Sequence, residues 1–183
     1  MIVILAGVSG CGKTTVGQVL ARWLDWPFSD GDLLHPAANI AKMARGEPLT
    51  DEDRTPWLRA IAARLDDWIA ADQPALLACS ALKRHYRAML LDGRPTAKLA
   101  FLTIDRNAAA QRLASRTGHF FKPELLDSQF ADLESPGPDE AAVVVIPSEA
   151  RPEATAREVV RRLELDGAIE AVPGPGAAGT GLV

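Results

Sequence analysis

The chain has few cysteines and no excess of positive charge. It contains two cysteines in 183 residues, too few for the disulfide framework of a small secreted domain, and this favours a reducing, cytoplasmic setting. The formal net charge is −4. Proteins that bind a nucleic-acid backbone usually carry a basic surplus, so nucleic acid is not expected as the main partner.

Long apolar runs are also missing. No stretch approaches the roughly 20 apolar residues that cross a bilayer, so no membrane partner is expected. No basic segment and cleavage site mark a signal peptide.

The length suits one domain with a good core, expected over 1–168. Residues 169–183 are rich in Gly, Pro and Ala and are expected to form a flexible tail.

A glycine-rich turn follows the first apolar run. Residues 7–14 read GVSGCGKT and come directly after IVILA at 2–6. This is the G-x-x-x-x-G-K-[ST] pattern in its required context of strand, turn and helix. Gly7, Gly10 and Gly12 can take backbone angles that a Cβ forbids, so that successive N–H groups turn toward one phosphate chain. A chance turn that caps a helix does not need the Lys-Thr pair that follows.

That pair supplies the charge and the oxygen that a nucleotide site needs. Lys13 offers a mobile charge to the β- and γ-phosphates, and Thr14 offers a hydroxyl to Mg²⁺. The helix that starts here adds its positive N-terminal end. The motif predicts these nucleotide-binding residues: Gly7, Val8, Ser9, Gly10, Cys11, Gly12, Lys13, Thr14 and Thr15.

Strand and helix patterns alternate along the chain. Strands are predicted at 2–6, 27–29, 76–79, 99–104 and 143–146. Helices are predicted at 13–24, 37–45, after Pro56, and at 82–91, 107–116, 123–133 and 153–165. This alternation predicts an α/β fold with a parallel sheet of about five strands, flanked by helices on both faces. Ligands of such a sheet bind at the carboxyl ends of its strands. The four tryptophans and both cysteines are expected to be packing residues.

Two carboxylates follow the second predicted strand, in Asp30-Gly31-Asp32. Phosphoryl transfer needs a metal ion on the phosphates and a carboxylate that orients or deprotonates the attacking hydroxyl. We assign Asp30 to the metal and its water, and Asp32 to the acceptor hydroxyl. A turn rich in Asp and Gly is the alternative. The third strand ends in Cys79-Ser80 and offers no carboxylate for the metal, which favours Asp30.

Basic residues follow two other strands. Arg112 and Arg116 are four residues apart on one helix face, before Gly-His-Phe-Phe at 118–121, and look like the base of a lid at about 117–124. Arginines there would neutralise charge on the transferred group as closure excludes water. A solvated basic helix face is the alternative.

Three further cations are candidates for an anionic acceptor. Arg54 offers the guanidinium that best clamps a carboxylate. Lys83 and Arg87 are four residues apart on the helix after Ser80 and serve the same purpose. Each of the three is alternatively an ordinary surface residue.

Over roughly residues 2–140 the chain resembles the gluconate kinases of the phosphate-loop class, which are relatives of shikimate kinase. The matching segments are GVSGCGKTTV (7–16), DGDLLHPAANIAKMARGEPLTDEDRTPWL (30–58), CSALKRHYR (79–87) and GHFFKPELLDSQFADLESP (118–136). The second and third are far more specific than the glycine-rich loop. After the last strand the family pattern has Val-Asp, whereas this chain has Val-Ile-Pro-Ser at 145–148, which leaves the adenine contacts open.

The resemblance implies phosphorylation of D-gluconate to 6-phospho-D-gluconate with ATP and Mg²⁺. It also implies a nucleoside-monophosphate-kinase-like fold with a lid and, in many members, a homodimer. The implied catalytic residues are Asp32, Lys13, Arg112 and Arg116. The implied acceptor-site residues are Asp32, His35, Arg54 and Lys83, and Arg87 and His119 are further substrate-binding candidates from their positions in the sequence. The implied metal-associated residues are Thr14 and Asp30.

Three other functions remain as alternatives. One is a kinase for another small hydroxy acid, such as shikimate or a different aldonate, and another is a nucleoside monophosphate kinase. The third is a nucleotide-binding switch. A GTPase switch would need N-K-x-D and a D-x-x-G after a strand, and the sequence contains neither.

Overall fold

The computed structural model describes residues 1–115 and 123–168. The expected tail at 169–183, and most of the expected lid at 117–124, lie outside the described residues. Within the described part of the chain, no helix combines the length and the apolar character that crossing a membrane requires.

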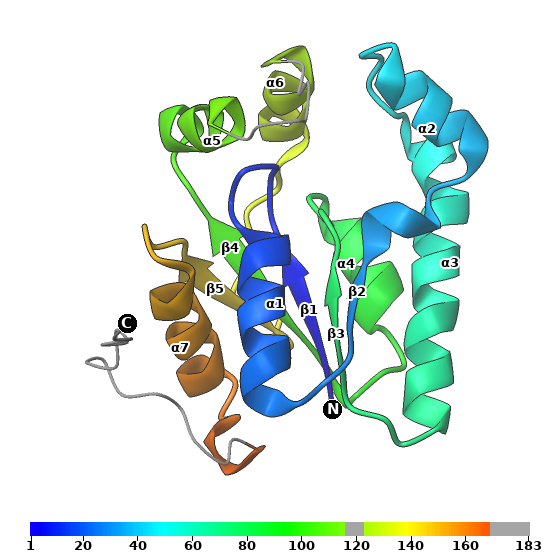
Figure 1. Ribbon diagram of the computed structural model, residues 1–183. Coiled ribbons are helices and arrows are strands. Elements are labelled where there is room, and N and C mark those ends of the chain that lie inside the picture. The colour runs from blue at the N-terminus through cyan, green and yellow to red at the C-terminus, as the bar shows by residue number, and fades with distance from the viewer. Residues whose placement is uncertain (116–122, 169–183) are drawn as a thin grey trace, which may run out of the picture.

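A parallel sheet of five strands forms the centre of the molecule (Figure 1). Its strands are β1 (Ile2–Ala6), β2 (Phe28–Asp30), β3 (Ala75–Ala78), β4 (Ala97–Thr103) and β5 (Val143–Pro147). Their order is β2-β3-β1-β4-β5, and every neighbouring pair is parallel. The predicted α/β fold is therefore confirmed. Because β1 lies between β3 and β4, the strand order reverses beside it, and the loop after β1 opens at the place where such sheets bind ligands.

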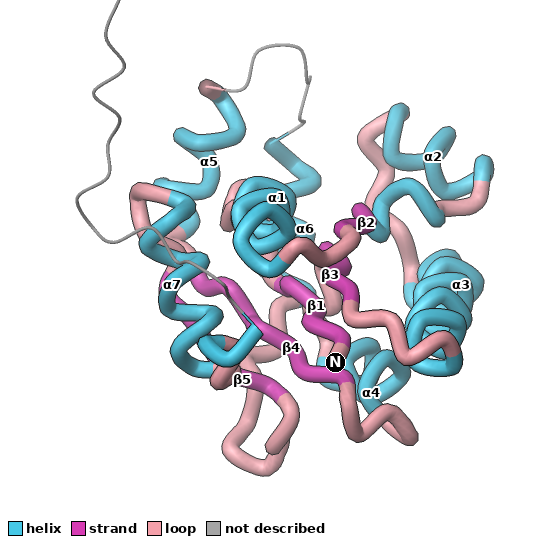
Figure 2. The backbone as a smooth tube through the Cα atoms, turned by 60° about the horizontal axis from the view of Figure 1, so that its bottom comes forward, coloured by secondary structure: helices cyan, strands magenta, loops and turns pink. Residues whose placement is uncertain are grey.

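Seven α-helices connect and cover these strands within the described residues. They are α1 (Lys13–Leu24), α2 (Ala37–Ala44), α3 (Asp51–Ala70), α4 (Arg84–Leu91), α5 (Arg106–Ala114), α6 (Pro123–Asp132) and α7 (Pro152–Arg162). Short 3₁₀ turns lie at η1 (Gly31–Leu34) and η2 (Asp166–Ala168). Figure 2 shows α1 and α7 on one face of the sheet and α3 and α4 on the other. The helices α2, α5 and α6 stand above the carboxyl ends of the strands (Figure 1).

Helix α3 begins at Asp51, so the prediction that it follows Pro56 is wrong. Thr50 and Asp53 form a reciprocal capping box, in which each side chain accepts from the backbone N–H of the other residue. Such a cap satisfies two N–H groups that a helix start otherwise leaves free, and this fixes the start before the proline. The earlier start places Arg54 in the first turns of the helix.

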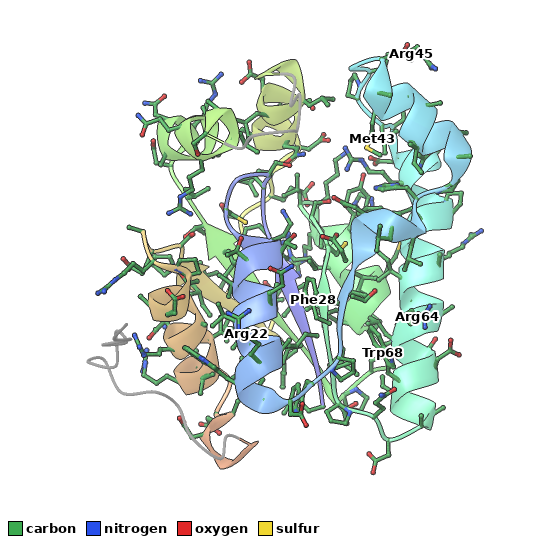
Figure 3. All side chains as sticks on the ribbon, viewed as in Figure 1. Arg22, Phe28, Met43, Arg45, Arg64 and Trp68 are labelled. Atoms are coloured by element: carbon green, nitrogen blue, oxygen red, sulfur yellow. The ribbon has the colours of Figure 1, made fainter. Side chains whose placement is uncertain are left out.

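The core is continuous around the sheet. All residues of β1 and β3 are buried, as expected for strands covered on both faces. Trp57 and Trp68 are buried, while Trp23 and Trp26 pack against the core from partly exposed positions, so the tryptophans pack as predicted. Both cysteines are buried and unbonded to each other, in agreement with the predicted packing role. Figure 3 shows Trp68 on the side of α3 that faces the sheet and Phe28 beside α1.

Candidate active site

The glycine-rich loop joins β1 to α1 and has the conformation that its glycines allow. Gly7, Gly10 and Gly12 all have positive φ angles, of 128°, 82° and 97°. A Cβ on Gly7 would lie 2.4 Å from the carbonyl oxygen of Leu102, closer than any real side chain approaches. The loop therefore depends on glycine for both its backbone angles and its packing on β4.

The two polar residues at the start of α1 have different partners. Lys13 Nζ donates to the carbonyl oxygens of Gly7 and Val8, at 2.9 and 3.0 Å. Thr14 Oγ1 donates to Asp30 Oδ2 at 2.9 Å. The structure thus brings together Thr14 and Asp30, the two residues predicted to lie near a metal.

This pair is suited to Mg²⁺. No group of three or more His, Cys, Asp or Glu side chains converges on one point among the described residues, so an all-protein metal cage is absent from that part of the chain. Mg²⁺ typically takes one or two protein oxygens and completes its shell with water and phosphate oxygens. A hydroxyl and a carboxylate beside a phosphate loop match that preference.

A cavity of ≈ 250 Å³ opens next to the loop. It lies between α6 on one side and the α2–α3 region on the other (Figure 1). Figure 3 shows Met43 on α2, at the side that faces this space. The cavity is lined by Ser9, Lys13, Asp32, His35, Met43, Pro48, Leu49, Arg54, Ser80, Leu125, Ser128 and Gln129.

Asp32 lies at the edge of this cavity with its side chain 75% exposed. Partial desolvation at the cavity mouth raises the pKa of the Asp32 carboxyl above its usual value. The charge of Lys13 acts in the opposite direction, and that of Asp30 adds to the rise. A carboxylate with a raised pKa is a stronger proton acceptor, as a general base requires.

His35 is buried against Trp57. Their rings stack with centroids 4.2 Å apart and planes 13° apart, and Trp57 Nε1 donates to the carbonyl oxygen of Gly31 at 2.7 Å. Burial, together with the charge of Arg54, lowers the pKa of His35 to about 4. The ring is therefore neutral near pH 7.

Asn39 fixes which ring nitrogen of His35 carries the proton. Its Nδ2 donates to the carbonyl oxygen of Asp53 at 2.8 Å, which identifies the amide nitrogen, and lies 3.4 Å from His35 Nδ1. His35 Nδ1 therefore accepts, and Nε2 bears the hydrogen. That Nε2 lies 4.0 Å from Asp32 Oδ1, so the ring presents its N–H toward the carboxylate.

Arg54 and Lys83 are joined through an acid. The Arg54 side chain is 9% exposed, its Nε donates to the carbonyl oxygen of Leu49 at 3.3 Å, and its Nη2 lies 3.4 Å from Asp132 Oδ2. Lys83 Nζ lies 2.6 Å from Asp51 Oδ1 and 3.4 Å from Asp132 Oδ1. Arg54 lines the cavity, whereas Lys83 is not one of its lining residues.

Arg87 does not reach the cavity, which corrects its predicted role in substrate binding. Its side chain is 0% exposed, and its Nε and Nη2 bond to the two oxygens of Glu140 at 2.7 and 2.8 Å. Its Nη1 donates to the carbonyl oxygens of Leu82 and Glu134 at 2.8 and 3.0 Å. With its donors in these bonds, Arg87 ties α4 to the segment before β5.

Arg112 lies beside the phosphate loop and does not line the cavity. Its Nη1 donates to Ser148 Oγ at 2.8 Å and its Nη2 to the carbonyl oxygen of Glu149 at 2.9 Å. Ser148 Oγ in turn donates to the carbonyl oxygen of Cys11 at 2.7 Å. Arg116 and His119 lie outside the described residues.

Sequence reasoning missed the contribution of α6. Leu125, Ser128 and Gln129 line the cavity from that helix, and Gln129 bonds directly to Ser9 of the loop. The segment LLDSQF belongs to the stretch that carries the family resemblance, and this signal was available. Only the fold shows which of its residues face the loop.

Comparisons with known proteins agree with this site. The sequence profile of the shikimate kinase family matches residues 9–164. The thermoresistant gluconokinase of Escherichia coli (strain K12) is 46% identical over 145 residues, which is 79% of this chain and 83% of that protein. The gluconokinase of Gluconobacter oxydans (strain 621H) is 45% identical over 89% of this chain and 91% of its own. The crystal structure of a gluconokinase from Sinorhizobium meliloti 1021 superposes with a TM-score of 0.79 at 40% identity, over 89% of this chain and 91% of that one.

Proposed function

The chain belongs to the gluconokinase family of phosphate-loop kinases, within the larger shikimate kinase family, and we propose that it transfers the γ-phosphoryl group of ATP to D-gluconate, giving 6-phospho-D-gluconate. One observation carries this proposal. A single cavity is lined by Lys13 of the phosphate loop, the carboxylate of Asp32 and the buried guanidinium of Arg54. These are the groups needed for a phosphate donor, a hydroxyl and a carboxylate.

In the proposed reaction, the terminal hydroxyl oxygen of gluconate forms a bond to the γ-phosphorus in line with the bond that breaks. The oxygen between the β- and γ-phosphorus atoms leaves with its electron pair as part of ADP, and the hydroxyl proton moves to the Asp32 carboxylate. Lys13 releases its two loop carbonyls and stabilises charge on the phosphates. Arg54 pairs with the gluconate carboxylate and so orients the chain.

We propose that Thr14 and Asp30 hold Mg²⁺ with its water. A bound Mg²⁺ supplies neutralisation of charge on the phosphate oxygens. Three other residues predicted from the sequence have roles apart from the metal. Arg112 remains a proposed charge-stabilising residue because it adjoins the loop through Ser148 and Cys11. Arg116 and His119 remain proposals from the sequence.

The organisation of the whole chain is likewise proposed. One catalytic domain over 1–168 is consistent with the continuous core around one sheet. A lid at 117–124 and a homodimer rest on the family resemblance. A cytoplasmic location is supported by two cysteines that are buried and unpaired, since disulfides are rare in reducing compartments.

The proposal is tested by a coupled assay of ADP formation with ATP, Mg²⁺ and a panel of acceptors. The panel contains D-gluconate, other aldonates, shikimate, glycerate, AMP and water alone. Turnover that depends on gluconate and far exceeds the rest of the panel is the expected result. ADP formation with none of the acceptors, while ATP still binds, would contradict a kinase function.

A kinase for another small hydroxy acid is the second candidate. The match to the shikimate kinase family favours keeping shikimate in the panel, because the same cavity would pair a carboxylate with Arg54 and a hydroxyl with Asp32. Turnover with shikimate or another aldonate, and not with gluconate, would retain the mechanism and replace the substrate.

A further inference from the structure

One face of α6 contacts both the phosphate loop and the cations proposed for the acceptor side of the active site. Ser9 donates its backbone N–H to Gln129 Oε1 at 2.7 Å, and Gln129 Nε2 lies 3.0 Å from Ser9 Oγ. This two-point bond joins the helix to the phosphate loop across 120 residues of sequence. Ser9 and Gln129 both line the cavity, so the bond lies at the border between the nucleotide and the acceptor.

Three residues further along, the same helix holds the cations of the acceptor side. Asp132 Oδ2 lies 3.4 Å from Arg54 Nη2, and Asp132 Oδ1 lies 3.4 Å from Lys83 Nζ. Residues three apart in a helix lie on the same side of it. Less than one turn of α6 therefore separates the residue that contacts the phosphate loop from the residue that contacts the guanidinium proposed to hold the carboxylate.

We propose that α6 acts as a spacer that sets the acceptor's chain length, with Gln129 and Asp132 as its two positioning residues. This inference rests on the proposed function and deepens it. The distance between the γ-phosphate and the carboxylate clamp fixes how many carbons separate the carboxylate from the hydroxyl that reacts. Neither residue takes part in bond making; each acts through its partner, Ser9 or Arg54.

The physical basis is the steep distance dependence of phosphoryl transfer. Reacting atoms must lie roughly 3–3.5 Å apart, and a misplacement of about 1 Å costs on the order of 10²-fold in rate. An aldonate with one carbon more or fewer shifts the terminal hydroxyl beyond that tolerance when both ends are held. If either end is loosened, the cavity accommodates the wrong length more easily and the right length less well.

The test compares acceptors of three lengths: the five-carbon D-xylonate, the six-carbon D-gluconate and the seven-carbon D-glucoheptonate. Two variants loosen one end each. Gln129→Met keeps the side-chain length and removes both bonds to Ser9, and Asp132→Asn keeps the shape and removes the charge that holds Arg54 and Lys83. The matched control is Asp127→Asn, because Asp127 lies on the same helix, pairs with Arg106 at the surface and does not line the cavity.

We expect wild type and Asp127→Asn to have the same ratio of kcat/KM for gluconate over each other aldonate. In both test variants this ratio falls by about tenfold, a fraction of the 10²-fold cost of misplacement. In Gln129→Met the loss for gluconate appears in kcat, with KM for ATP little changed. Equal losses of kcat/KM for all three acceptors in both variants would overturn the spacer inference. The proposal that the protein is a gluconate kinase would still stand.

Failure of the proposed function has a different signature, which is wild-type protein that turns over none of the three aldonates. If Gln129→Met does not fold, as judged by its thermal unfolding, Gln129→Asn replaces it. That variant retains an amide but shortens its reach by one methylene group. A ratio of kcat/KM for gluconate over the other aldonates that lies between the ratios of wild type and Asp132→Asn supports the spacer. The wild-type ratio in a folded Gln129→Asn protein overturns it.

Discussion

The phosphate loop and the acceptor cavity are adjacent at one edge of the sheet, but they are assembled in different ways. The loop comes from one continuous stretch, 7–15, and its lysine bonds within that stretch to Gly7 and Val8. The cavity shares Ser9 and Lys13 with the loop and adds side chains from η1, the α2–α3 region, α3 and α6. Its main cation, Arg54, is held by Asp132, which is 78 residues away in sequence.

This contrast determines how each half responds to change. The glycines and the loop's own carbonyls fix the backbone conformation of the loop locally, while its position relative to the acceptor side depends on Gln129 of α6. The cavity depends on tertiary contacts between acids and bases, so substitutions there separate binding of the acceptor from binding of ATP. The predictions below use this separation, from the largest expected effect to the smallest.

Removal of the Asp32 charge tests the boundary between the two halves. We expect Asp32→Asn to lower kcat by about 10²–10⁴-fold, the usual contribution of a positioned general base, while ATP affinity changes little. Steady-state kinetics gives kcat, and calorimetry with a non-hydrolysable ATP analogue gives the affinity. Asp67→Asn, an exposed position on α3, is the isosteric control. Turnover of Asp32→Asn near the wild-type value would show that another group accepts the proton.

Substitution of Arg87 tests whether this buried cation contributes to acceptor binding or only to stability. Removing one partner of a buried ion pair leaves the other charge unpaired, so we expect Arg87→Met to lower the free energy of unfolding by about 3–5 kcal/mol. KM for gluconate should not change, because the guanidinium bonds to Glu140 and to carbonyl oxygens. Urea unfolding and steady-state kinetics measure the two quantities.

The double variant Arg87→Met/Glu140→Leu is the control for that prediction. It leaves no unpaired carboxylate, so part of the lost stability should return. A large rise in KM for gluconate in the folded single variant would restore Arg87 to the substrate site.

Arg54 separates the two substrates most directly. Truncating a buried, hydrogen-bonded charge costs about 2–5 kcal/mol in binding, so Arg54→Ala should raise KM for gluconate by roughly 10²-fold and KM for ATP far less. Arg54→Lys keeps the charge and loses the planar fork, and an intermediate KM is expected. Initial-rate measurements with each substrate varied in turn provide the comparison. Equal effects on both substrates would remove Arg54 from the carboxylate role.

The same contrast explains what the sequence could predict. The sheet, its helices and the loop follow from local patterns: strands of three to seven residues alternate with helical periods, and the glycines lie where positive φ angles are needed. The start of α3 was misplaced because Pro56 outweighed the capping box of Thr50 and Asp53. Spacing along one helix cannot tell Lys83 from Arg87, since only the fold brings Glu140 to the latter.

His35 offers the smallest effect and the sharpest test of the acceptor half, because it is detected through stability and not through turnover. In the folded protein its pKa is about 4, below the value of 6.5 expected of an unfolded chain. Between these two pH values the unfolded chain binds more protons, so the free energy of unfolding falls as pH falls through this window. The full contribution, on the order of 2 kcal/mol once solvent in the cleft is considered, is present above pH 6.5.

Urea unfolding at several pH values compares wild type with His35→Gln, which cannot titrate. The difference between the two curves isolates His35, because Asp32 still titrates in both proteins and acts with the opposite sign: its raised pKa favours the folded state as pH falls. The Arg54 charge that opposes protonation of His35 is also retained. We expect the difference in unfolding free energy to shrink from pH 6.5 toward pH 4. Parallel curves would mean that folding leaves the pKa of His35 unchanged, and the lowered pKa of the buried ring would then be wrong.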